Sequence, residues 1–113
     1  MSIDFTYFPT VLNARYVDAI GGECTFTIVG AEVYTTQDGK DLKCLQLQTE
    51  DDDIILFNPN ATNRLKLNEA GLRNSDEMIG YRLVLHTVVV SLGNEDKRGV
   101  RIREILTPLS KVI

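Results

Sequence analysis

Tryptophan is absent from this chain of 113 residues, histidine occurs once, and aromatic residues make up only 7% of the total. The single histidine, His86, lies inside an apolar run with no cysteine, serine or carboxylate pattern beside it that would suggest a catalytic triad. We therefore expect a protein that binds its target and catalyses no reaction, with no cofactor.

Cysteine is also scarce, with only Cys24 and Cys44 in the chain. They are not spaced as a metal knuckle, and each falls inside a strand-like run, so we interpret them as reduced, packed thiols, with a disulfide or ligand role as the alternative. The acidic run at residues 50–53 lacks the alternating spacing and the glycine of a calcium loop. It predicts a solvated turn, and no metal site is expected.

No apolar run approaches the length that crosses a bilayer, and residues 1–10 lack the basic segment and apolar stretch of a secretory signal. We expect no membrane association and a cytoplasmic location. The length and the 43% hydrophobic content favour one domain covering residues 1–113. A net charge of −4 requires any nucleic-acid site to be a local basic patch.

Alternating apolar and polar residues predict strands over 23–36 and 42–49, joined by a hairpin turn at 37–39, and a short strand over 54–57. Gly30 interrupts the first alternation and predicts a bulge or sharp bend. Residues 1–22, which contain an aromatic cluster, are expected to form an N-terminal arm.

Beyond Pro59 the period changes, and Asn60 or Thr62 can cap a short helix that ends near Gly71. A β-branched run predicts a strand over 81–92, residues 93–98 a turn, and residues 99–105 a last strand. Three strands, a helix and two strands are the layout of the OB-fold. The predicted fold is therefore all-β with one short helix, a five-stranded OB-fold barrel over about residues 23–106.

Four short motifs resemble a family of small bacteriophage and prophage OB-fold proteins related to phage single-stranded DNA-binding proteins. Asn60-Ala61-Thr62-Asn63 is similar to the Asn-x-Thr-Asn element that opens the family's helix, and Ile79-Gly80 to the entry of its fourth strand. The segments 25–28 and 99–103 are similar to its first and closing strands. Met78 stands where relatives often carry tryptophan, and the basic residue usual after the glycine is displaced to Arg82.

Basic and aromatic residues supply the candidate site. The resemblance implies an oligonucleotide-binding face, and in OB-folds this face involves strands two and three and the loops after strands one and four. Aromatic rings there add sequence-tolerant base stacking. The candidate DNA-binding residues are Tyr34, Lys40, Lys43, Phe57, Lys97, Arg98, Arg101 and Arg103.

Residues of these types can also serve the fold or its solubility without contacting DNA. Phe57 suits a core, and lysines and arginines on exposed strands often serve solubility alone. Helix capping accounts for Asn60, Thr62 and Asn63 without any ligand contact.

The leading hypothesis is a non-sequence-specific, phage-type accessory protein that binds single-stranded DNA during replication or recombination. The alternative is a non-catalytic OB-fold module for protein interaction or assembly, which its open strand edges could make homodimeric. The first hypothesis requires Lys40, Lys43, Arg101 and Arg103 to gather beside an exposed aromatic ring. Scatter of these four side chains over different faces would favour the second.

Overall fold

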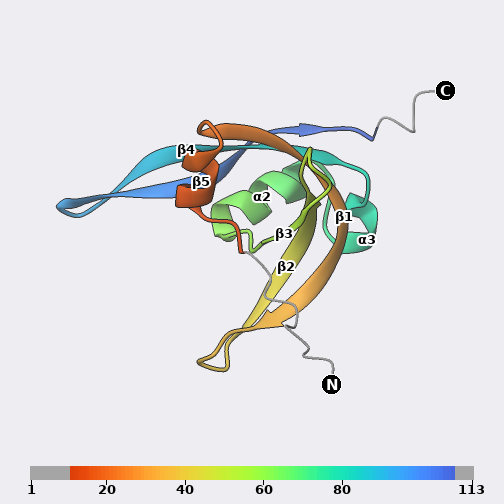
Figure 1. Ribbon diagram of the computed structural model, residues 1–113, viewed down its shortest axis with the longest axis horizontal. Coiled ribbons are helices and arrows are strands. Elements are labelled where there is room, and N and C mark those ends of the chain that lie inside the picture. The colour runs from red at the N-terminus through yellow and green to blue at the C-terminus, as the bar shows by residue number, and fades with distance from the viewer. Residues whose placement is uncertain (1–10, 109–113) are drawn as a thin grey trace, which may run out of the picture.

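Five strands form one antiparallel sheet in the computed structural model, which describes residues 11–108 (Figure 1). The strand order is β3-β2-β1-β4-β5. The strands are β1 (Glu23–Thr35), β2 (Asp41–Gln48), β3 (Ile54–Phe57), β4 (Arg82–Leu92) and β5 (Glu95–Leu106), and the helices are α1 (Ala14–Ala19), α2 (Ala61–Glu69) and α3 (Ser75–Met78). The prediction of a mostly β protein is confirmed.

One face of the curved sheet, here called the inner face, carries the hydrophobic core. Phe26 and Ile28 of β1 are at most 1% exposed, and the alternation that predicted their strand puts both on this face. Leu67 of α2 and Val17 of α1 pack into the same cluster. Burying a side chain of this size contributes about 1.5 to 3 kcal/mol, so the inner face dominates the stability of the fold.

A long, bent β1 joins the two halves of the sheet. Its first part pairs with β4 from residue 23 to 27, and its second part pairs with β2 up to residue 35. The register with β2 shifts between Ile28 and Gly30, which confirms the irregularity predicted there. The Gln46 side-chain amide occupies the space that a Cβ atom at position 30 would take, so a larger residue there would have to displace this side chain.

The helix α2 begins and ends where the sequence predicts. The Asn60 side chain accepts a hydrogen bond from the backbone N–H of Asn63 at 3.0 Å and caps the first turn. Gly71, with φ of 84°, ends the helix, and the Leu72 N–H donates back to the Leu67 carbonyl at 2.9 Å. Leu67 and Leu72 are both buried, so the cap also contributes an apolar contact.

The prediction of a closed barrel is wrong, because no ladder among residues 11–108 joins β3 to β5. The chain just before α1 takes the free edge of β3: Val11 forms a parallel bridge with Leu56, and the Leu12 N–H donates to the Leu56 carbonyl at 2.7 Å. β3 has only four residues, so little of its edge is left for another strand.

At the other border of the sheet, the side chain of Asn63 occupies the edge of β5. Its Nδ2 donates to the Val100 carbonyl and its Oδ1 accepts from the Ile102 N–H, each at 3.0 Å. A side-chain amide presents an N–H donor and a carbonyl acceptor next to each other and thus imitates the backbone of a neighbouring strand. Figure 1 shows α2 inside the curve of the sheet, where it fills the opening in place of strand pairing.

Two further predictions need correction. The described residues contain three short helices and not one, since α1 lies within the predicted arm and α3 follows Asn74, which caps it. Helices of six and four residues are too short for a helical period to show. The turn predicted at residues 93–98 is confined to Gly93 and Asn94, because both strands continue to it.

Residues 1–10 of the predicted arm lie outside the described residues. Within 11–108, none of the helices has the length and apolar character needed to span a membrane.

Candidate functional site

The outer face of β5, opposite the core, carries three of the predicted cations. Ile102 is buried on the inner face opposite Leu85, and the regular pairing from there to the hairpin places Lys97 and Arg101 on the outer face. Arg103 lies on this face too, because it forms an ion pair with Glu23, which is paired with His86. Successive outward residues are about 7 Å apart along a strand. Lys97, Arg101 and Arg103 therefore form a row, here called the β5 row.

Arg82 extends this basic face onto β4. It is paired with Thr27 and Leu106, and its guanidinium donates to the Thr107 carbonyl at 3.5 Å. The row is not purely basic, since the ion pair between Arg103 and Glu23 measures 2.6 Å. Strand alternation also puts Glu95 on this face. Within residues 11–108, neither Lys97 nor Arg101 of the β5 row forms an ion pair.

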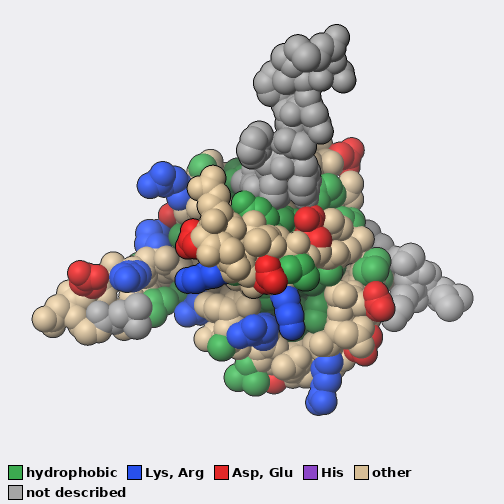
Figure 2. Space-filling model, turned by 90° about the horizontal axis from the view of Figure 1, so that it is seen from below, with side chains coloured by type: hydrophobic (Ala, Val, Ile, Leu, Met, Phe, Trp, Pro, Cys, Tyr) green, Lys and Arg blue, Asp and Glu red, His purple; other side chains and the backbone are tan. Residues whose placement is uncertain are grey.

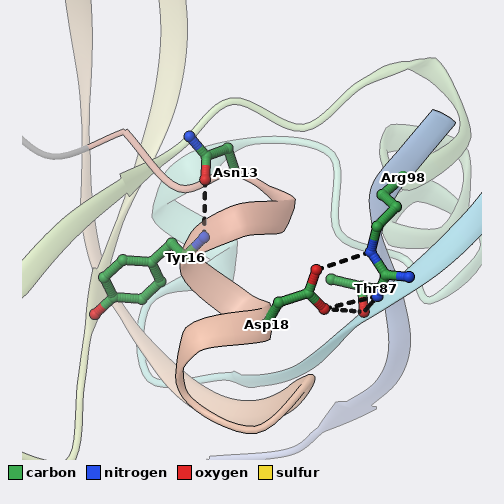
Figure 3. A network of polar contacts seen from close by, with 5 residues as sticks. All are labelled: Asn13, Tyr16, Asp18, Thr87 and Arg98. Atoms are coloured by element: carbon green, nitrogen blue, oxygen red, sulfur yellow. Dashed lines mark hydrogen bonds and ion pairs between the residues drawn. The ribbon is translucent and has the colours of Figure 1, made fainter.

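Arg98 lies on the inner side of the hairpin and is engaged by the protein itself (Figure 3). Its Nε and Nη2 donate to the two Asp18 carboxylate oxygens at 2.8 and 2.7 Å, and Nη2 also donates to the Thr87 hydroxyl at 2.7 Å. The hydrogen bonds from Arg98 lower the pKa of Asp18, and those to Asp18 raise the pKa of Arg98. Arg98 thus connects α1 to the β4–β5 hairpin, and its charge is matched.

The remaining candidates lie elsewhere. Tyr34 is half-buried in β1 opposite Leu42, and Lys40 is exposed in the β1–β2 hairpin loop. Lys43 shares the inner face with Leu45, so it lies on the side of the sheet opposite the β5 row. Phe57 is 3% exposed within the core cluster, so its ring does not face solvent for base stacking.

An open groove of about 620 Å³ lies where the end of the β1–β2 hairpin passes α2 and α3. Lys43 is joined there by Arg64 of α2 and by Arg73, two residues that the sequence did not single out. None of the three takes part in an ion pair within the described residues. Leu45, Leu67 and other apolar side chains form the floor, so the groove is apolar with a cationic rim.

Figure 2 looks at the molecule from the side of the β1–β2 hairpin. Blue side chains lie around the centre of this face and on the arm at its left, with red ones interspersed and green ones between them. The cations therefore do not form one continuous basic surface on this face. The cations of the groove and those of the β5 row are two separate groups.

His86 and the two cysteines are the other side chains with catalytic chemistry to consider. His86 is half-buried in β4. Both cysteines are free, and burial is the main cause of their raised pKa values, with Glu50 adding to the effect at Cys24 and Glu32 at Cys44. A raised pKa keeps a thiol protonated at neutral pH and makes it a poor nucleophile. Among residues 11–108, no three His, Cys, Asp or Glu side chains group as a metal site.

The predicted cluster is thus not assembled in one place, because Lys43 and the Arg101–Arg103 pair lie on opposite faces of the sheet. No family model, curated protein or solved structure matches the chain.

Proposed function

We propose that the chain is a non-catalytic, single-stranded DNA-binding protein of the OB type, in which α2 and residues 11–12 fill the opening between β3 and β5. Its antiparallel order β3-β2-β1-β4-β5, with α2 between β3 and β4, supports this assignment. The resemblance to phage accessory proteins supports a role in replication or recombination.

The observation that carries the proposal is the β5 row. Lys97 and Arg101 lie on the same face of the β4–β5 hairpin, which extends from the body of the protein (Figure 1); Lys97 is exposed, and Arg101 is half-buried with its guanidinium donating to the Val100 carbonyl at 3.3 Å. A row of cations along an extended strand can follow a phosphate backbone, and contacts of this kind are independent of base sequence. Arg82, which forms no ion pair within the described residues, lies beside them and strengthens the local positive potential in a protein of net charge −4.

The second candidate is an OB-type protein-interaction module. A specific observation favours it: Arg98 and Arg103 are paired with Asp18 and Glu23, and Lys43 lies on the other face of the sheet. The DNA proposal therefore depends on fewer free cations than the sequence suggested.

A binding experiment with matched variants distinguishes the two proposed functions. Lys97→Ala/Arg101→Ala removes two charges from the β5 row, and Arg15→Ala/Lys66→Ala removes two from exposed positions on α1 and α2. Fluorescence anisotropy with a labelled oligonucleotide of about 20 nucleotides, at low salt, measures affinity. We expect the first variant to bind at least tenfold more weakly to every sequence tested, because backbone contacts carry no sequence information.

The control variant is expected to bind within about twofold of wild type, because its lost charges lie on α1 and α2, which pack against the inner face of the sheet, opposite the row. Equal losses in both variants would mean that only net charge matters, and the β5 row would then not be the binding site.

A further inference from the structure

The cationic groove has the chemistry of a docking site for an acidic segment. Its rim carries Lys43, Arg64 and Arg73, and Glu32, which accepts a hydrogen bond from Gln46 at 2.9 Å, is the one carboxylate that lines it within residues 11–108. The floor is aliphatic, and no aromatic side chain among residues 11–108 lines it. The groove therefore suits carboxylates that are followed by an aliphatic side chain better than it suits stacked bases.

The same chain presents such a segment at the β2–β3 turn. Glu50, Asp51, Asp52 and Asp53 are all exposed, and Ile54, which follows them, keeps 45% of its surface exposed. No Lys or Arg among residues 11–108 forms an ion pair with these four carboxylates. The described part of the chain thus leaves an acidic turn and a cationic groove uncompensated.

The turn cannot reach the groove of its own molecule. Lys43 lies near the start of β2 and the turn follows its end, so the intervening strand separates them by about 17 Å. Because this strand holds the two complementary surfaces apart, each can be contacted only by another molecule.

We propose that the acidic turn of one copy docks in the cationic groove of a second copy. The carboxylates of residues 50–53 then face Lys43, Arg64 and Arg73, and Ile54 covers part of the aliphatic floor. Because the two surfaces differ and lie at opposite ends of β2, the contact is head-to-tail and builds chains of copies. It is independent of the DNA proposal, and where both hold, neighbouring copies would contact each other along the strand.

Complementary charge reversals test the contact without DNA. The groove variant is Lys43→Glu/Arg64→Glu, and the turn variant is Glu50→Lys/Asp51→Lys. All four side chains are exposed, so the fold should tolerate both changes, which circular dichroism checks. The control is Arg15→Glu/Lys66→Glu, which changes net charge as much as the groove variant does.

Sedimentation velocity at about 50 mM salt gives the readout. Wild type and control should sediment faster as concentration rises from about 10 to 500 μM, without levelling at a dimer, and salt at about 0.5 M should suppress the rise. Each reversal variant alone should remain monomeric. An equimolar mixture of the two should associate again, because the intact turn of the groove variant matches the intact groove of the turn variant, and the two reversed surfaces are also opposite in charge.

Three outcomes would overturn the inference. Wild type could stay monomeric throughout, whatever its affinity for DNA, or it could level at a dimer, as edge-to-edge strand pairing predicts. In the third, the mixture of the two reversal variants would sediment as monomer, as each variant does alone. None of these outcomes bears on DNA binding, which anisotropy measures separately.

Discussion

Asn63 carries more of the structure than its place in a helix suggests. It is 3% exposed, and its side chain satisfies two backbone groups of β5 that would otherwise lack a strand partner. The sequence pattern assigned it to helix capping, a task that the side chain of Asn60 performs alone. Its actual contacts are 37 and 39 residues away along the chain, which no local pattern indicates.

Replacing Asn63 with alanine should lower the free energy of unfolding by about 1 to 3 kcal/mol, because the Val100 carbonyl and the Ile102 N–H lose their partner. Urea denaturation measures the change. Asn68→Ala, at an exposed position on the same helix, is the control and should stay within about 0.5 kcal/mol of wild type. Equal stability of Asn63→Ala and wild type would show that β5 does not need this side chain.

Asn63→Asp separates the two hydrogen bonds. An ionised carboxylate still accepts from the Ile102 N–H but has no proton to donate to the Val100 carbonyl. We expect Asn63→Asp to be destabilised at pH 7 and to recover part of the loss near pH 4, where protonation restores a donor. No recovery on acidification would contradict the assigned donor role.

At the scale of elements, α1 is held to the β4–β5 hairpin by Asp18 and Arg98. Both side chains are partly exposed, at 36% and 51%. The pair therefore contributes modestly and is screened by salt. Its role is to fix where the hairpin, and with it the β5 row, points relative to the body of the protein.

The pH dependence of this contact has a definite sign. Arg98 lowers the pKa of Asp18 in the folded state, so the stabilisation is complete above the unfolded value of about 4 and is lost as pH falls through the lower, folded value. Asp18→Asn should unfold at a lower temperature than wild type at pH 7, and the difference should shrink below pH 4. Thermal unfolding from pH 2.5 to 7 checks this, and a constant difference over that range would contradict it.

Most elements could be predicted from the sequence, since half-buried strands alternate and α2 has both a cap and a terminating glycine. The β4–β5 hairpin tip could not. Residues 95–98 are all exposed, so no apolar side marks them as strand, and their charges resemble a turn. Barrel closure was wrongly predicted because the competitors for the strand edges, Val11–Leu12 and Asn63, act through tertiary contacts.

The site was only partly predictable for a related reason. The alternation of apolar and polar residues in β5 correctly predicts that Arg101 faces away from the core. The same alternation in β2 places Lys43 on the face of the sheet that Leu45 occupies. The open groove beside Lys43 could not be foreseen, because it depends on where α2 and α3 pack. Arg64 and Arg73 become neighbours of Lys43 only through that packing.

At the scale of the whole molecule, the DNA-binding proposal depends on where an acidic protein places its cations. The net charge is −4, yet Lys97 and Arg101 lie on the outer face of β5, and Lys43, Arg64 and Arg73 line a groove on another side. Local potential, and not the total, governs the approach of a polyanion. A protein arranged in this way should bind DNA weakly at physiological salt and much better at low salt.

The salt dependence of wild-type binding to single-stranded DNA tests the central claim most directly. Each phosphate neutralised on a single strand contributes about −0.7 to the slope of log affinity against log salt. With two to three contacts from the β5 row, anisotropy titrations between about 25 and 200 mM salt should give a slope of about −1.4 to −2.1. No binding at tens of micromolar protein and low salt, or a slope near zero, would contradict the proposal that this chain binds single-stranded DNA.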